Sequence, residues 1–213
     1  MNAYKIKMCK RENGCRNAVY KESEITDEIV LIFDGINYTD FIKREIKGPV
    51  KSHHQFKVTI SCCPNSCPMP QIVDLGIVAA SPVMVSNENC SNCNSCINTC
   101  IEDAILLDEI KGPEIFHDRC VYCAKCAENC PTETITIKES GFRIMVGGKL
   151  GRHARLASEL PGIFSKQETL IIIKNSIKLL KENYSRAKRF ADLFSIYDEN
   201  QIFRKIAADF LAN

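Results

Sequence analysis

The cysteines are the residues whose type and spacing say most about chemistry. The 213-residue chain contains 13 of them, and its first residues, MNAYKIKMCK, lack the apolar stretch of a secretion signal. A reducing cytosol would keep these side chains as thiols, so a disulfide framework is not expected. The number is odd and the cysteines are crowded, which favours thiolate cages around metal. We therefore expect a cytoplasmic protein with iron–sulfur chemistry.

Eight of the cysteines form two runs with the same internal spacing. The runs are Cys90-x2-Cys93-x2-Cys96-x3-Cys100 and, 30 residues later, Cys120-x2-Cys123-x2-Cys126-x3-Cys130-Pro131. Three thiolates on a tight turn can bind three irons of one cubane, while the fourth thiolate ligates the other cluster. The spacing therefore predicts two [4Fe–4S] clusters. One is held by Cys90, Cys93, Cys96 and Cys130, and the other by Cys120, Cys123, Cys126 and Cys100.

This block, about Asn87–Lys138, resembles the bacterial two-cluster ferredoxins. It departs from their pattern at Ile101, which stands where proline would follow Cys100. A pair of structural zinc sites is the alternative, but zinc ribbons need only two cysteine pairs rather than two runs of four. We expect a two-cluster ferredoxin domain at residues 86–139.

Five cysteines remain, and four of them form two further pairs. The first pair, Cys9-x5-Cys15, contains an Asn-Gly turn, and the second, Cys63-x3-Cys67, lies in a proline-rich loop after a short alternating strand. Two pairs from separate loops supply four thiolates, which is enough for a third [4Fe–4S] cluster. The fifth, Cys62, is interpreted as a buried spare thiol.

The sequence predicts both strands and helices to position these loops. Alternating and apolar runs predict one sheet, and capping boxes at Ser165 and Asp198 predict two helices near the C-terminus. The expected strands are Lys57–Ile60, Ile72–Val78 and Phe142–Val146. The expected helices are Thr39–Lys47, Leu170–Tyr184 and a last one after Asp198, while Asp27–Phe33 fits either a strand or a helix. This predicts an α+β fold whose strand order the sequence does not give.

Charge and hydropathy exclude two classes of partner. The net charge is +2, which gives no argument for nucleic acid, and no apolar run reaches the roughly 20 residues of a membrane span. A glycine-rich turn, Gly147–His153, carries Lys149 and Arg152. Its backbone N–H groups and cations could bind an anion, although such a turn alone is a weak signal.

Three motifs in this order resemble the siroheme sulfite and nitrite reductase family. They are Cys9-x5-Cys15, Cys63-Pro-Asn-Ser-Cys67 continued by Pro-Gln-Ile-x-Asp-x-Gly-Ile, and Gly-Gly-Lys-x-Gly-Arg. With the ferredoxin block after the second motif, the chain from Met8 is similar to the C subunit of anaerobic sulfite reductase. It is also similar to the small dissimilatory sulfite reductase-like proteins of anaerobes and methanogens.

The resemblance implies a cluster on Cys9, Cys15, Cys63 and Cys67 that abuts siroheme, with Cys67 as the bridge. Siroheme carries carboxylates and the substrate is an anion, so a basic pocket is implied. Arg16, Lys149 and Arg152 are the preferred residues for cofactor binding and catalysis. The wider set of candidates is Lys10, Arg11, Arg16, Lys149, Arg152, His153 and Arg155.

The resemblance also implies the domain plan and the activity. One sulfite/nitrite reductase-type repeat would comprise residues 1–85 and 140–213, with the ferredoxin domain inserted between them. Electrons from a low-potential donor, a ferredoxin or a reductase subunit, would reduce sulfite, nitrite or a similar small anion. Full-size members carry a preceding second copy of the fold. The pocket would therefore be completed by a second subunit or a homo-oligomer, or would accept another substrate. The alternative function is an electron-transfer or sensor module without siroheme.

Overall fold

The computed structural model describes residues 1–9, 15–20 and 24–210 of the chain. Its centre is a five-stranded sheet of order β1-β2-β3-β8-β9. The strands are β1 (Tyr4–Met8), β2 (Phe56–Ser61), β3 (Leu75–Ala80), β8 (Gly141–Val146) and β9 (Ser158–Glu159). The first three are parallel to one another and β8 runs antiparallel to β3, so the sheet is mixed.

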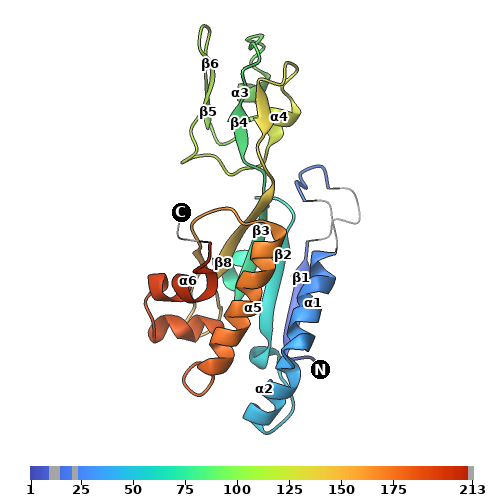
Figure 1. Cartoon of the computed structure of the whole chain (residues 1–213), viewed down its shortest axis with the longest axis vertical. Coiled ribbons are helices and arrows are strands. Elements are labelled where there is room, and N and C mark those ends of the chain that lie inside the picture. The colour runs from blue at the N-terminus through green and yellow to red at the C-terminus, as the bar shows by residue number, and fades with distance from the viewer. Residues whose placement is uncertain (10–14, 21–23, 211–213) are drawn as a thin grey trace.

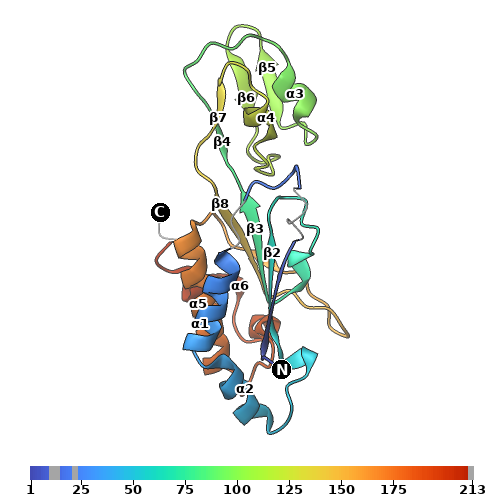
Figure 2. The same ribbon diagram turned by 90° about the vertical axis from the view of Figure 1, so that its right-hand side faces the viewer.

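One face of the sheet is covered by helices (Figures 1 and 2). The helices of this lobe are α1 (Ile25–Gly35), α2 (Tyr38–Ile46), α5 (Lys166–Glu182) and α6 (Glu199–Ala207). Alternate strand residues such as Val58, Ile77 and Ile144 are buried against helix residues such as Ile29 and Ile177. Side chains alternate between the two faces of a strand, so one face of each strand supplies this core. We call the sheet with its helices the large lobe.

The opposite face of the sheet is crossed by a short element, η2 (Pro70–Ile72), which contacts β2, β3 and β8. Two other short elements lie elsewhere: η1 (Ser52–His54) precedes β2, and η3 (Phe190–Ser195) contacts α5 and α6. A Cβ atom on Gly76 would lie 2.4 Å from the Pro70 carbonyl oxygen, so the close approach of η2 requires glycine there. Gly76 points away from the helices because its neighbours Leu75 and Ile77 are in the core.

A buried carboxylate ties the start of β3 to the rest of the large lobe. Asp74 is 1% exposed, accepts two hydrogen bonds from Arg189 at 3.0 and 2.9 Å, and accepts a third from the backbone N–H of Lys57. Burial raises the pKa of Asp74, and these three donors oppose that rise. Removing Arg189 would leave a buried charge without its partner.

The remaining elements form a small lobe beyond one end of the sheet (Figure 1). They lie between Val83 and Ile137 and make two separate two-stranded sheets, β4 with β7 and β5 with β6. The elements are β4 (Val83–Val85), α3 (Ser95–Thr99), β5 (Ile105–Asp108), β6 (Gly112–Ile115), α4 (Lys125–Glu128) and β7 (Ile135–Ile137). The chain enters this lobe from β3 and returns from it into β8.

Most of the expected elements are present. The α+β class is confirmed, β2 and β8 match their predicted ranges, and α1 settles the ambiguous Asp27–Phe33 segment as a helix. Both capping boxes form, with Glu168 N–H donating to Ser165 Oγ and Gln201 N–H donating to Asp198 Oδ1. The third strand begins at Leu75 rather than Ile72, because Pro70–Ile72 form η2. Among the described residues no helix has the length and apolar character needed to cross a membrane.

Candidate metal centres

The cysteines of the large lobe gather where two parallel strands end. Cys9 follows β1 and Cys63 lies two residues beyond β2, and parallel neighbours end at the same edge of a sheet. The backbone N–H of Cys62 donates to Cys9 Sγ at 3.2 Å, and the Cys9 N–H donates to the Ile60 carbonyl at 2.9 Å. These contacts hold Cys9 beside the start of the second cysteine loop.

The other two cysteines of this set face Cys63. Burial raises the pKa of the Cys63 thiol, and Cys15, Cys67 and Cys9 raise it further because each of them lies close enough to repel its negative charge. Cys63 is 6% exposed, whereas Cys15 and Cys67 are exposed. Cys63 is thus a buried thiol on which the charges of the other three predicted ligands act, while ligation of a cluster by these four stays a prediction. Cys62 is 1% exposed, as the sequence suggested.

The small lobe repeats one backbone arrangement twice. The N–H of Asn92 donates to Cys90 Sγ and the N–H of Tyr122 donates to Cys120 Sγ, each at 3.4 Å. Both loops are followed by a single helical turn or two, α3 and α4, that carries the third cysteine. The duplication in the sequence is therefore also a duplication in conformation.

Each repeat directs its last cysteine toward the other repeat. The charges that act on Cys96 come from Cys90 and Cys130, and those that act on Cys126 come from Cys123, Cys120 and Cys100. Burial is the larger effect in both cases and raises the pKa of Cys126 to about 12. Exposed Cys93 differs, because its hydrogen bonds with Ser95 and Ser91 lower its pKa to about 7. The structure brings these sulfurs together in the crossed groups that the spacing predicts, while ligation itself stays a prediction.

The chemistry of these donor sets fits clusters of iron. Each of the three groups offers four thiols, and thiolate is the ligand that iron–sulfur clusters take. Within the described residues, no three His, Cys, Asp or Glu side chains are arranged to hold one metal ion.

Among the predicted basic residues that the structure describes, Lys149 and Arg155 lie away from the large-lobe cysteines. Lys149 Nζ lies 2.7 Å from Asp192 Oδ1, and its backbone pairs with Arg155 in a small hairpin beyond β8. Val146, the last residue of β8, pairs with Leu75 at the start of β3. Cys63 lies beyond the other end of the sheet, because it follows Ser61 of β2, which pairs with Val78 near the end of β3. Six strand residues separate these two edges by roughly 17–20 Å.

The other cations of the predicted set have different surroundings. Arg155 donates to the carbonyls of Gly147 and Leu156 and stacks on Phe194 at 3.6 Å, so it holds the hairpin in place. Arg16 and Arg152 are exposed, as is His153. Lys10 and Arg11 lie outside the described residues. Of the preferred three, Arg16 is the one that lies next to a cysteine of the large lobe.

The sequence reasoning missed three lysines on the face of the sheet opposite the helices. Lys5 and Lys7 alternate with the core-facing residues of β1, and Lys57 on β2 pairs in register with Lys5. Lys5 and Lys7 are exposed and Lys57 is partly so. The two strands that carry them lead directly into Cys9 and Cys63. The alternation in Tyr4–Met8 was the available signal for this lysine face.

Comparisons with known proteins agree with this arrangement. The family described as nitrite and sulphite reductase 4Fe-4S domain matches residues 2–211. The coenzyme F420-dependent sulfite reductase of Methanocaldococcus jannaschii is 41% identical over 101 residues, which cover 46% of this chain and 16% of that protein. A ferredoxin of Methanothermococcus thermolithotrophicus is 32% identical over 62 residues, 27% of this chain and 98% of the ferredoxin.

A solved structure shows the same fold. Dissimilatory sulfite reductase I matches with a TM-score of 0.60 and 15% identity, over 94% of this chain and 51% of that one. The chain therefore spans only part of the sulfite reductases that it resembles.

Proposed function

Since the chain belongs to the nitrite and sulphite reductase 4Fe-4S domain family, we propose that it reduces sulfite, nitrite or a similar small anion at a siroheme beside the large-lobe cysteines. The family establishes the coarser function, an iron–sulfur electron-transfer protein of the sulfite reductase type. In the proposal, residues 86–139 are the ferredoxin domain and hold two clusters, and Cys9, Cys15, Cys63 and Cys67 hold a third. A low-potential donor in the cytoplasm supplies the electrons.

One observation carries the proposal. Cys9 and Cys63 follow the ends of the two strands that carry the lysine face, and Cys67, which is exposed, lies four residues after Cys63. An exposed thiolate beside a cluster is what a bridge to a second iron requires. Bound siroheme would supply an iron on which the anion is reduced.

The chain's own cations would neutralise the anions. Of the lysine face (Lys5, Lys7 and Lys57), Lys7 lies two residues before Cys9, and Arg16 follows Cys15, so these two cations fit the carboxylates of the tetrapyrrole and the charge of the substrate. Lys5 and Lys57 lie nearer the opposite end of β1 and β2. Lys149 and Arg152 are the remaining candidates from the sequence. Lys149 would have to leave Asp192 to take part.

Metal and tetrapyrrole analysis tests this function. Protein purified without oxygen should contain about 13 irons per chain, four for each of three cubanes and one in about one siroheme. Cys67→Ser should remove siroheme absorption and activity while the spectra of the two small-lobe clusters persist. A sample with its iron but no extractable tetrapyrrole would contradict the proposal.

The alternative, an electron-transfer module without siroheme, has one observation in its favour. Lys149 is neutralised by Asp192 and Arg155 is hydrogen-bonded to backbone carbonyls, so two of the candidate cations are already engaged. This alternative predicts about 12 irons per chain, four for each cubane, and no tetrapyrrole. A second copy of the chain or another subunit could instead complete the pocket, and measuring siroheme per assembled complex separates these outcomes.

A further inference from the structure

The two cysteine loops of the small lobe make a matched pair. We define the outer loop as Ser91–Asn94 and the inner loop as Val121–Ala124, at equivalent positions of the duplication. Two residues of each loop have left-handed backbone, with φ of 53° and 61° at Asn92 and Asn94 and of 62° and 56° at Tyr122 and Ala124. Because the backbones match, differences between the loops reflect what surrounds them.

The surroundings differ sharply. All four residues of the outer loop are exposed, whereas Ala124 of the inner loop is 2% exposed and its other three residues are half-buried. Asparagine tolerates left-handed backbone, but tyrosine and alanine pay about 1 kcal/mol or more for it. Ala124 recovers part of this cost by packing with Val83 and Ile135. The residues of the outer loop therefore suit a solvent-exposed position, and those of the inner loop suit a buried one.

The inner loop is hydrogen-bonded to the large lobe. The N–H of Ser81, the residue directly after β3, donates to the Tyr122 carbonyl at 2.8 Å, and Ser81 is 2% exposed. Tyr122 lies between two predicted cluster ligands, Cys120 and Cys123. The end of β3 lies at the same edge as Cys63, since Val78 pairs with Ser61.

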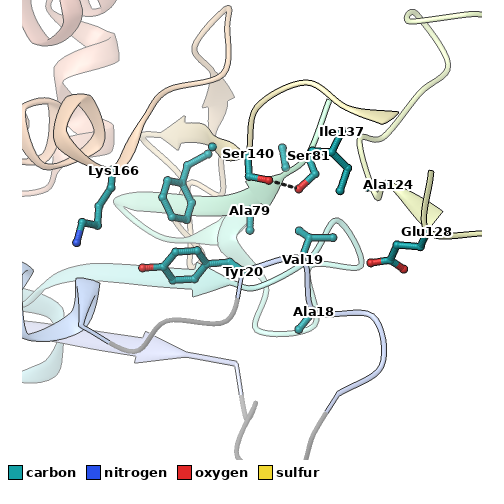
Figure 3. Close-up of a pocket in the computed structure, with 13 residues that line it drawn as sticks. Ala18, Val19, Tyr20, Ala79, Ser81, Ala124, Glu128, Ile137, Ser140 and Lys166 are labelled. Carbon is teal, nitrogen blue, oxygen red and sulfur yellow. Dashed lines mark hydrogen bonds between the residues drawn. The ribbon is translucent and has the colours of Figure 1, made fainter. Parts of the chain in front are cut away.

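Beside this contact the two lobes are not densely packed. A cavity of about 500 Å³ lies at their junction, with Val19 and Tyr20 on the large-lobe side and Ala124 and Glu128 on the small-lobe side (Figure 3). Val19 and Tyr20 donate backbone hydrogen bonds to the Cys62 carbonyl, so this side belongs to the large-lobe centre. Electrons tunnel better along bonds and hydrogen bonds than across a gap. The Tyr122–Ser81 contact thus supplies a bonded route where the cavity does not.

From these observations we propose a direction for electron flow. Electrons enter the small lobe at the centre of the outer loop (Cys90, Cys93, Cys96 and Cys130). They cross to the large lobe from the centre of the inner loop (Cys120, Cys123, Cys126 and Cys100) through the Tyr122–Ser81 hydrogen bond. This inference rests on the proposed function, because it assumes that all three centres hold clusters.

The redox balance of each step is simple. A reduced one-electron donor protein, of the iron–sulfur or flavin class, is oxidised by one electron and the outer centre is reduced by one. The same electron then passes to the inner centre and to the large-lobe centre. No atom is transferred and no bond to the chain is made or broken.

Two matched variants test the order, Cys93→Ala in the outer loop and Cys123→Ala in the inner loop. Each holoprotein is mixed with a reduced bacterial-type ferredoxin, freeze-quenched and examined by EPR, and the large-lobe signal is identified as the one that Cys67→Ala removes. With Cys123→Ala, the outer centre should be reduced at the unaltered rate, while the large-lobe centre is reduced about 100-fold more slowly. With Cys93→Ala, the inner and large-lobe centres should both be slowed.

The opposite pattern would overturn the inferred order. If Cys93→Ala left the inner centre reduced at the unaltered rate and the large-lobe centre oxidised, electrons would enter at the inner loop. Unchanged reduction of the large-lobe centre in both variants would also overturn it. If Cys67→Ala removed no EPR signal, the proposed function itself would fail, which distinguishes the two ideas.

A third variant keeps every cluster ligand, in case loss of a cysteine unfolds the small lobe. Ser81→Pro removes the N–H that Tyr122 accepts from. With its iron content retained, it should leave reduction of both small-lobe centres unchanged and slow that of the large-lobe centre about tenfold or more. An unchanged rate at the large-lobe centre would exclude this hydrogen bond as the route.

Discussion

The large and small lobes bury very different interiors. In the large lobe, rings stack around Phe33, which lies 4.4 Å from Tyr4 and 5.5 Å from Tyr38 between ring centroids, and aliphatic residues of α1 and α5 pack on the sheet. In the small lobe the buried cluster comprises Val83, Cys96, Ala124, Cys126 and Ile135, so two of its five members are cysteines. Small domains with too little apolar interior are commonly held by metal. The difference indicates that apolar packing stabilises the large lobe and that cluster binding stabilises the small one.

Removing iron should produce the largest difference in stability between the two lobes. Chelation under anaerobic conditions should unfold the small lobe, because binding energy at a cysteine site is also folding energy, while the large lobe keeps its helices. Hydrogen exchange followed by mass spectrometry measures both lobes in one sample. Amides of β4 and β7 that remain protected without iron would show that the small lobe folds without its clusters.

A cavity in the large lobe should give the next largest effect. Phe33→Ala removes a fully buried ring and should lower the free energy of unfolding of this lobe by about 3–5 kcal/mol. Leu31→Ala on the same helix is the matched control, since Leu31 is 70% exposed and should cost less than about 1 kcal/mol. Denaturant titration by circular dichroism measures both. Equal losses for the two variants would contradict the core assigned here.

Acidification should affect the large lobe through Asp192. Burial alone would raise the pKa of Asp192, but hydrogen bonds from Lys149 and from the Arg189 N–H outweigh it and lower the pKa below 3.8. A carboxylate whose pKa is lower in the folded state contributes stability that is full above its unfolded pKa and is lost as pH falls through the folded value. Stability should therefore fall below about pH 4.

The variant Asp192→Asn isolates that contribution. Its stability at neutral pH should be lower than that of the unaltered chain by about 1 kcal/mol, and its decline below pH 4 should be shallower. Thermal unfolding across about pH 2.5–6 measures both quantities. Parallel acid curves for the two proteins would show that the Lys149–Asp192 pair contributes nothing to stability.

Salt should have the smallest effect of these changes. It tests the difference in charge between the small lobe and the rest of the chain. Residues 86–139 carry 10 acidic and 4 basic side chains, whereas the whole chain carries 26 acidic and 28 basic ones. A donor protein with a basic surface should therefore reduce the small lobe a few-fold more slowly when ionic strength rises from about 0.05 to 0.5 M. Stopped-flow mixing measures the rate. A donor with an acidic surface is the control, and its rate should rise or stay constant.

Local patterns were enough to predict much of this molecule. The capping boxes at Ser165 and Asp198 set helix starts by contacts within four residues, and the alternation around Val58 set a strand. The two cysteine runs of the small lobe were recognised from local spacing as well, while their assignment to clusters stays a prediction. In these cases the chemistry is contained in a short stretch of chain.

What depended on distant contacts was not predictable. The turn at Pro70–Ile72 forms where η2 packs over Gly76, and the lysine face exists because β1 pairs with β2 across some 50 residues of chain. Lys149 read as a free cation, yet its partner Asp192 lies 43 residues away. Strand order and ion pairs of this kind are decided by tertiary packing rather than by propensity.

The two chain segments that connect the lobes leave the large-lobe sheet at neighbouring residues. Ala80 and Gly141 are paired neighbours at the end of β3 and β8, and just above them Lys138 N–H donates to the Pro82 carbonyl at 2.9 Å. The chain between Ala80 and Gly141 therefore leaves the antiparallel pair β3–β8 and returns to it at the same point. In a simple hairpin, a turn of two residues would connect the strands there. The strand register of β3 and β8 is therefore set by their own pairing, from Leu75–Val146 to Ala80–Gly141, and not by the residues between them. The sheet of the large lobe can thus accept different inserted segments between β3 and β8.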